Sequence, residues 1–159
     1  MCNSLPALAV IDMGNHNEGL DTLDTLRERG GRYWWLSMRE CNACGQRWLV
    51  AQEERINDIF CLRRLDEKEI EHLARDNQWP SDFDRFESLL RIALRAGKRV
   101  KFADPMAVSL LDTAVDLSIE KPGIKVSEIA ELLNISRGQA LEISKRVQRE
   151  RGAEIGFDD

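Results

Sequence analysis

Apolar residues recur every three or four positions along much of this chain, which is the spacing of one buried face of an α-helix. Asp66 and Ser136 stand where an N-cap oxygen can accept from a first-turn backbone N–H, and Gly97 follows another periodic stretch. The pattern predicts six helices, over residues 18–28, 66–76, 81–96, 105–117, 127–133 and 137–150.

A different pattern fills the region between the first two of these helices. Residues 32–38 are rich in aromatic side chains and bounded by glycines, which is typical of a strand. Residues 46–52 and 57–62 read as two further strands. Residues 8–11 are either one more short strand or an apolar lead-in to the first helix.

The helix over residues 105–117 is apolar nearly all round, which predicts a buried helix. We expect it to be the first of three helices near the end of the chain. The predicted fold class is therefore α+β and mostly helical, with a small three-stranded antiparallel sheet and a trihelical C-terminal part. The domain boundary follows Gly97, so the predicted domains are residues 1–97 and 98–159.

The last two predicted helices meet at Asn134, a residue type that tolerates the left-handed backbone of a turn between helices. The region around this turn has small, polar and apolar residues at the offsets of a known motif, namely Ala130, Asn134, Ile135, Ser136, Ala140 and Ile143. On these residues the stretch resembles the helix-turn-helix of bacterial DNA-binding domains. In that family the second helix of the motif lies in the major groove of DNA.

The resemblance implies a set of DNA-contacting residues on the second helix. Arg137 and Gln139 would approach base edges, while Lys145, Arg146 and Arg149 would contact phosphates. The alternative is a helical hairpin that closes a hydrophobic core and touches no DNA.

Two cysteines separated by two residues, Cys41 and Cys44, are followed at once by Gly45. This corner resembles the knuckle of a zinc ribbon, in which two thiolates point at one ion and glycine allows the tight turn. The resemblance implies a zinc ligand set of Cys41, Cys44 and Cys61, with His16, His72 or Cys2 as a possible fourth ligand. The alternative is a degenerate ribbon, in which the turn survives without metal and Cys61 is a buried apolar residue.

Charge is unevenly distributed along the chain, whose formal net charge is −5. Residues 1–94 hold 12 Lys and Arg against 17 Asp and Glu, whereas residues 95–152 hold 11 against 8. The basic excess therefore falls on the part that resembles a helix-turn-helix, as phosphate contact requires.

Other classes of protein find little support in the sequence. There is no apolar run of membrane-spanning length and no signal-peptide pattern, so we expect a cytoplasmic protein with reduced thiols. The chain has no phosphate-binding glycine loop and only two histidines, so we do not expect an enzyme.

The sequence leads to two main functional hypotheses. The first is a DNA-binding regulator whose partner is duplex DNA. The second is a protein that resembles bacterial toxin-immunity proteins in size, charge and mixed fold, and that would present acidic residues Glu53, Glu54 and Asp58 to a basic toxin. A stand-alone adaptor held by zinc is a third interpretation.

Overall fold

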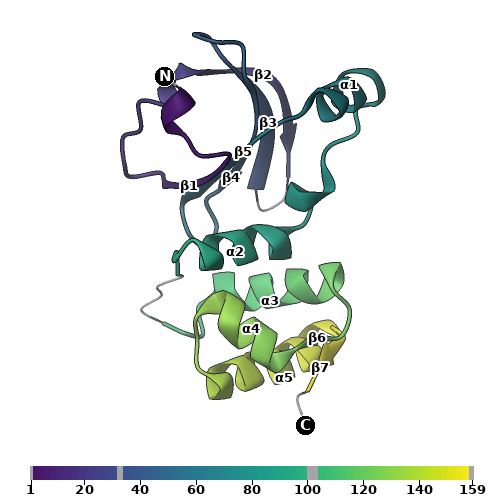
Figure 1. Cartoon of the computed structure of the whole chain (residues 1–159). Helices are drawn as coiled ribbons and strands as arrows, with labels where there is room; N and C mark the ends of the chain where they lie inside the picture. The colour runs from purple at the N-terminus through teal and green to yellow at the C-terminus, as the bar shows by residue number, and fades with distance from the viewer. Residues whose placement is uncertain (1, 32–33, 100–103, 158–159) are drawn as a thin grey trace. The chain divides into compact units, whose positions relative to one another are not determined.

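The computed structural model describes residues 2–31, 34–99 and 104–157 (Figure 1). The chain folds into an N-terminal unit, residues 1–96, and a C-terminal unit, residues 97–159. The N-terminal unit contains the 3-10 helices η1 (Cys2–Ser4), η2 (Leu20–Thr22) and η3 (Ser81–Phe83), the strands β1 (Leu8–Asp12), β2 (Leu23–Gly30), β3 (Trp34–Cys41), β4 (Arg47–Glu53) and β5 (Ile59–Arg64), and the helices α1 (Glu67–Asp76) and α2 (Phe86–Arg95).

The five strands of the N-terminal unit form one antiparallel sheet in the order β1-β5-β4-β3-β2. The α+β class is confirmed, but the sheet has five strands and not the three that the sequence predicts. Strands β3, β4 and β5 lie close to the three predicted segments, with residues 32–33 outside the described residues. Of the two alternatives for residues 8–11, the structure contains the strand β1.

The prediction of a helix over residues 18–28 is wrong, because the chain forms η2 and then β2 there. Leu20, Leu23 and Leu26 are three residues apart and therefore match one helix face. In the structure the pairing of β2 with β3 shifts between Thr25 and Arg27, so that Leu26 is the extra residue of a bulge and is 49% exposed. An extra residue breaks the two-residue alternation that would have marked a strand.

The two faces of the sheet carry different sets of buried side chains. One face packs in a single apolar cluster, whose buried members are Cys2, Leu5, Ala9, Ile11, Leu23, Cys41, Trp48, Val50 and Leu62. On the opposite face the Trp34 ring stacks on Phe86 of α2 at a centroid distance of 5.5 Å, and its indole N–H donates to the Phe83 carbonyl at 3.1 Å. Successive residues of each strand therefore belong to different layers of the N-terminal unit.

Helix α1 begins with the N-cap that the sequence predicts. The Asp66 carboxylate accepts from the Glu69 backbone N–H at 2.9 Å, and the Glu69 carboxylate accepts from the Asp66 N–H at 3.1 Å. The helix predicted over residues 81–96 is divided into η3 and α2, and no side chain caps α2 at Arg85.

A buried carboxylate shapes the turn between β4 and β5. The Glu53 side chain accepts from the backbone N–H groups of Arg55, Ile56 and Asn57 at 2.9, 2.8 and 2.9 Å. Glu53 is 0% exposed, and burial raises the pKa of its carboxyl, while the three N–H groups act in the opposite direction.

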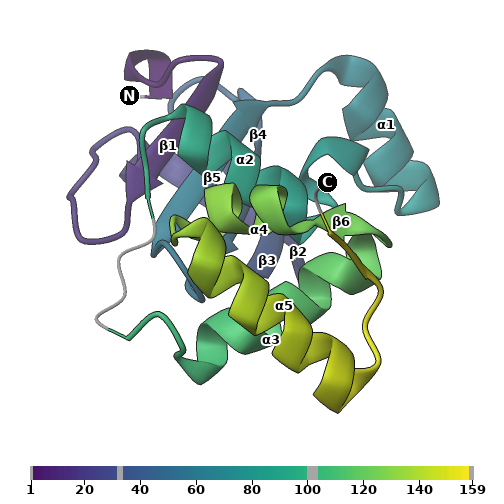
Figure 2. The same cartoon turned by 90° about the horizontal axis from the view of Figure 1, so that it is seen from below.

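The C-terminal unit contains α3 (Val108–Glu120), β6 (Ile124–Lys125), α4 (Val126–Leu133), α5 (Arg137–Arg151) and β7 (Ile155–Gly156). The three helices pack against one another, as Figure 2 shows for α5 with α3 and α4. Helix α3 begins at Val108 and not at residue 105, because the Asp104 carboxylate accepts from the Met106 N–H in a preceding turn. Strands β6 and β7 pair in parallel, so the unit is not purely trihelical as predicted.

The turn between α4 and α5 has the backbone that the sequence predicts. Asn134 is left-handed, with φ 51° and ψ 44°, and the Ile135 N–H donates to the Ala130 carbonyl at 3.1 Å. The Ser136 hydroxyl accepts from the Gln139 backbone N–H at 3.2 Å, and the Gln139 amide oxygen accepts from the Ser136 N–H at 2.9 Å. This reciprocal cap defines the first turn of α5.

Within the described parts of the chain, none of the helices combines the length and the apolar character needed to cross a bilayer.

Replacement of Glu53 by alanine should lower the free energy of unfolding by at least about 2 kcal/mol, because three backbone donors would lose a charged acceptor. Glu54→Ala is the matched control, since Glu54 is exposed and should change stability by no more than about 0.5 kcal/mol. Urea unfolding measures both effects. Equal stability of the two variants would contradict the role given to Glu53.

Candidate metal centre and candidate nucleic-acid interface

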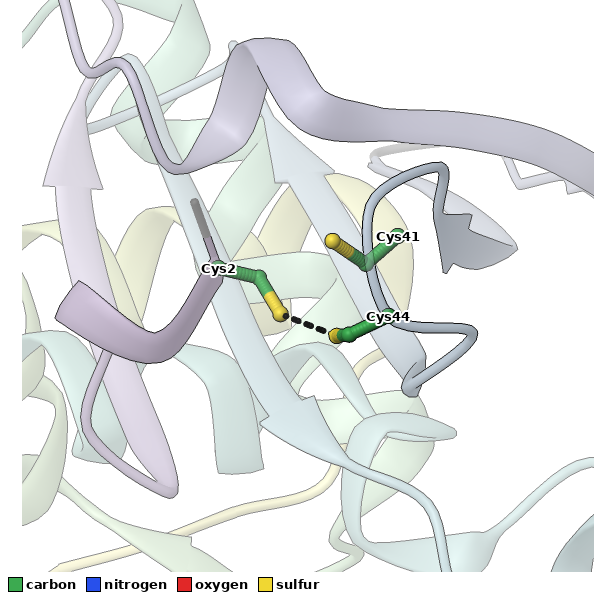
Figure 3. Close-up of side chains that lie close together, drawn as sticks. All are labelled: Cys2, Cys41 and Cys44. Atoms are coloured by element: carbon green, nitrogen blue, oxygen red, sulfur yellow. Dashed lines mark hydrogen bonds between the residues drawn. The ribbon is translucent and has the colours of Figure 1, made fainter.

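Three cysteines from two distant parts of the sequence meet on one face of the sheet. Cys41 is the last residue of β3, Cys44 lies in the turn before β4, and Cys2 comes from η1. Their sulfur atoms all lie within 4.8 Å of one another, and the Sγ atoms of Cys2 and Cys44 are 3.3 Å apart (Figure 3). This three-sulfur cluster could hold a metal ion.

The turn from β3 to β4 folds Cys44 back toward Cys41. The Cys41 carbonyl accepts from the N–H of Gly45 at 2.8 Å and from the N–H of Cys44 at 3.3 Å. Gly45 has φ +72°, a left-handed backbone that glycine adopts without steric cost. The Cys41 N–H then donates to the Gln46 carbonyl at 2.9 Å and starts the pairing with β4. The tight turn predicted for the knuckle therefore forms mainly through the backbone of residues 41–46, and the Asn42 N–H also donates to the Thr22 carbonyl at 2.9 Å.

Cys41 is surrounded by hydrogen-bond donors. Its pKa is lowered to about 6 by the Thr22 hydroxyl first, and then by the backbone N–H groups of Ala43 and Cys2, against the opposing effect of burial. The Thr22 oxygen lies 3.5 Å from the Cys41 sulfur and 2.9 Å from the Gly19 carbonyl oxygen. A hydroxyl has one proton, so the two acceptors compete for it.

Cys2 is in the opposite electrostatic situation. Burial, followed by the hydrogen bonds with Cys44 and Cys41, raises its pKa to about 11. Cys2 is 1% exposed, as is Cys41, whereas Cys44 lies on the surface. A metal ion that binds here must displace the Cys2 proton, because thiolates are the binding form.

Trp48 packs in the same apolar layer as Cys2 and Cys41, and its indole carries an unused donor. Trp48 is 0% exposed, and its Nε1 has no hydrogen-bond partner among the described residues. The Trp48 side chain acts to lower the pKa of Cys2, against burial and the other two cysteines, which raise it. A metal-bound thiolate at Cys2 would be a stronger acceptor for this N–H than a neutral thiol is. The surroundings of the cluster therefore fit a thiolate-bound ion.

Cys61 does not join the cluster, and the ligand set predicted from the sequence is corrected here. Its neighbour Leu62 packs in the same apolar layer as Cys2 and Cys41. Adjacent residues of a strand point to opposite faces, so Cys61 points to the other side of the sheet. There it is 0% exposed, and burial together with the charge of Glu53 raises its pKa to about 12.

The two histidines also lie apart from the three-sulfur cluster. His16 is exposed and lies 3.4 Å from the Asp21 carboxylate. His72 is exposed on α1 and lies 3.5 Å from the Asp76 carboxylate. Among the described residues, Cys2 is the member that completes the group with Cys41 and Cys44.

The residues expected to contact DNA do not share one face of α5. Arg137, Lys145 and Arg149 are exposed. Successive helical residues are about 100° apart, so Arg146 lies on the side of α5 opposite Arg137. Arg146 lines a groove with α3 residues and binds the Glu150 carboxylate at 3.0 Å.

Gln139 is also less available than the sequence suggests. Its amide oxygen accepts from the Ser136 N–H in the helix cap, so its amide nitrogen is the group left for an outside partner. The turn itself carries a further cation, because the Arg99 guanidinium donates to the Asn134 side-chain oxygen at 3.2 Å. Of the residues expected to contact DNA, Arg137, Lys145 and Arg149 are therefore the exposed cations, and Arg99 lies beside the turn.

The acidic residues expected to face a toxin lie at the β4–β5 turn. Glu54 and Asp58 are exposed, but Glu53 points inward and binds the turn's own backbone. Glu53 cannot offer its carboxylate to a partner in this conformation.

Comparison with protein-family models, curated proteins and solved structures gives no match for this chain.

Zinc binding should depend on Cys2 and not on Cys61. Alanine at Cys2, Cys41 or Cys44 removes one of the three clustered sulfurs and should strongly reduce the zinc that co-purifies with the full chain. Cys61→Ala is the matched control, since it removes a buried cysteine from the opposite face and should leave the zinc content unchanged. Elemental analysis of the folded variants provides the measurement. Zinc loss in Cys61→Ala with retention in Cys2→Ala would reverse the assignment.

Proposed function

We propose that this protein is a non-enzymatic DNA-binding regulator that uses α4 and α5 as a helix-turn-helix. The observation that carries the proposal is the left-handed turn at Asn134 followed by the capped start of α5, with Arg137, Lys145 and Arg149 exposed along that helix. A 15-residue helix is about 22 Å long, which suits insertion along a major groove.

The charges of α5 support contact with phosphates, although some of them are paired. Lys145 lies 3.5 Å from the Glu142 carboxylate, and Arg149 lies 3.6 Å from the Glu150 carboxylate. Exposed pairs of this kind contribute about 0–1 kcal/mol, so a phosphate can replace the carboxylate at small cost. Lys145 and Arg149 would bind phosphates, and Arg137 at the start of the helix would approach base edges.

We further propose that the ion in the three-sulfur cluster is zinc, with a structural role. Thiolates are preferred ligands of zinc, and a bound ion would join η1 to the β3–β4 turn through Cys2, Cys41 and Cys44. Such a site suits a compartment in which thiols stay reduced, and we propose the cytoplasm.

The second candidate, a toxin-immunity protein, has weaker support. The acidic N-terminal unit remains suited to a basic partner, and Glu54 and Asp58 are exposed at its β4–β5 turn. However, Glu53 is buried and Arg55 lies between the two exposed acids, which reduces the negative charge that this turn can offer. We therefore favour the DNA-binding function.

Alanine at Lys145 or Arg149 should weaken duplex binding and should reduce the slope of log K against log[salt] by about 1, because one phosphate contact is lost. Arg137→Ala should instead reduce the preference among duplex sequences by roughly 1–3 kcal/mol. Fluorescence anisotropy with labelled duplexes, measured over a salt series, gives both quantities.

Lys68→Ala is the matched control for the DNA measurements. Lys68 is exposed on α1 of the N-terminal unit, and its replacement removes the same charge outside the helix-turn-helix. It should leave the salt slope unchanged. Absence of salt-dependent binding to any duplex, or an equal loss in Lys68→Ala, would contradict the proposal. If the protein binds no duplex, rescue of cells from a toxin by co-expression of this protein would favour the immunity function.

A further inference from the structure

We propose that the ion in the three-sulfur cluster keeps one coordination position open at the surface beside Cys44, and that this position takes a neutral nitrogen donor from outside the chain. The inference rests on the proposed metal site and adds a binding function to it. Zinc and related divalent ions favour four ligands.

The described part of the chain supplies three of these ligands. Cys2, Cys41 and Cys44 form a group whose ligand atoms meet, and no described histidine, aspartate, glutamate or further cysteine belongs to it. A three-ligand protein site with an open fourth position is the arrangement in which metal ions bind water or an outside molecule.

The position of the exposed sulfur indicates where the open side lies. Cys2 and Cys41 are buried against Trp48, so this side of the cluster is closed by the protein. Cys44 is exposed and borders a surface groove of about 740 Å³, to which Asn3 and Gln46 also contribute. This space is large enough for an imidazole ring to approach the cluster from the solvent.

The charges around the open side favour a neutral donor over an anion. Three thiolates and a divalent cation carry a net charge of −1. The groove adds the acidic side chains Glu40, Asp66 and Glu67 and the basic side chains Arg47 and Arg64. Their sum is also negative, and a fourth thiolate or a carboxylate would be repelled.

The hydrogen-bond donors around the cluster also favour a neutral ligand. The backbone N–H groups of Ala43 and Cys2 donate to the sulfur of Cys41. These donors would offset the negative charge of a buried thiolate at Cys41. An imidazole nitrogen needs no such compensation, so it is the donor that the site suits best.

The experiment uses the full chain loaded with Co²⁺, whose absorption reports both the sulfur ligands and the coordination geometry. The probe is imidazole, added in excess after loading. The cobalt d–d bands should shift with imidazole and reach saturation, while the sulfur-to-cobalt charge-transfer absorption should persist because all three thiolates stay bound. 2-Mercaptoethanol, as a thiolate donor, should shift the same bands only at higher concentration.

Three results would overturn the inference. Unchanged d–d bands would mean that the chain itself supplies all four ligands. Loss of the charge-transfer absorption would mean that imidazole competes with the thiolates. Tighter binding of 2-mercaptoethanol than of imidazole would contradict the neutral donor. Failure of Co²⁺ to bind at all would instead refute the metal site on which the inference rests. Cys61→Ala is the control for general effects of cysteine loss, and its cobalt spectra should match those of the unchanged chain.

Discussion

Side chains on a strand alternate between the two faces of its sheet, and this alternation decides which cysteines of the chain can meet. Cys41 on β3 and Trp48 on β4 face the layer into which η1 brings Cys2. Cys61 on β5 faces the other layer, where it lies near Glu53, and among the described residues it belongs to no group that could hold a metal ion. A shift of any of these strands by one residue would exchange the two sets.

The local parts of both sites could be predicted from the sequence. The pair of cysteines followed by Gly45 predicts a tight turn, and Asn134 with Ser136 predicts the turn and cap between α4 and α5. In each case the signal lies within a few consecutive residues, because it depends on backbone conformation and on side chains that bind neighbouring N–H groups.

The parts that the sequence could not supply depend on distant contacts. Cys2 meets Cys44 across a sequence separation of 42 residues, which requires the path of η1 and the pairing of β1 with β5. Cys61 was predicted as a ligand from the resemblance of the Cys41–Gly45 corner to a zinc ribbon, which carries no information about sheet faces. The bulge at Leu26 interrupts the alternating pattern of β2, so the sequence did not predict this strand. Glu53 stands next to another glutamate in the sequence, which gave no sign that its side chain is buried. Each of these features is decided by packing and pairing partners far along the chain.

We propose that Cys2, Cys41 and Cys44 together bind one metal ion through their three sulfurs. X-ray absorption fine structure of the zinc-loaded full chain can count these ligands, because it resolves sulfur neighbours at about 2.3 Å from lighter neighbours at about 2.0–2.1 Å. We expect three sulfur neighbours and one nitrogen or oxygen neighbour. Four sulfur neighbours, or two or fewer, would contradict the proposal.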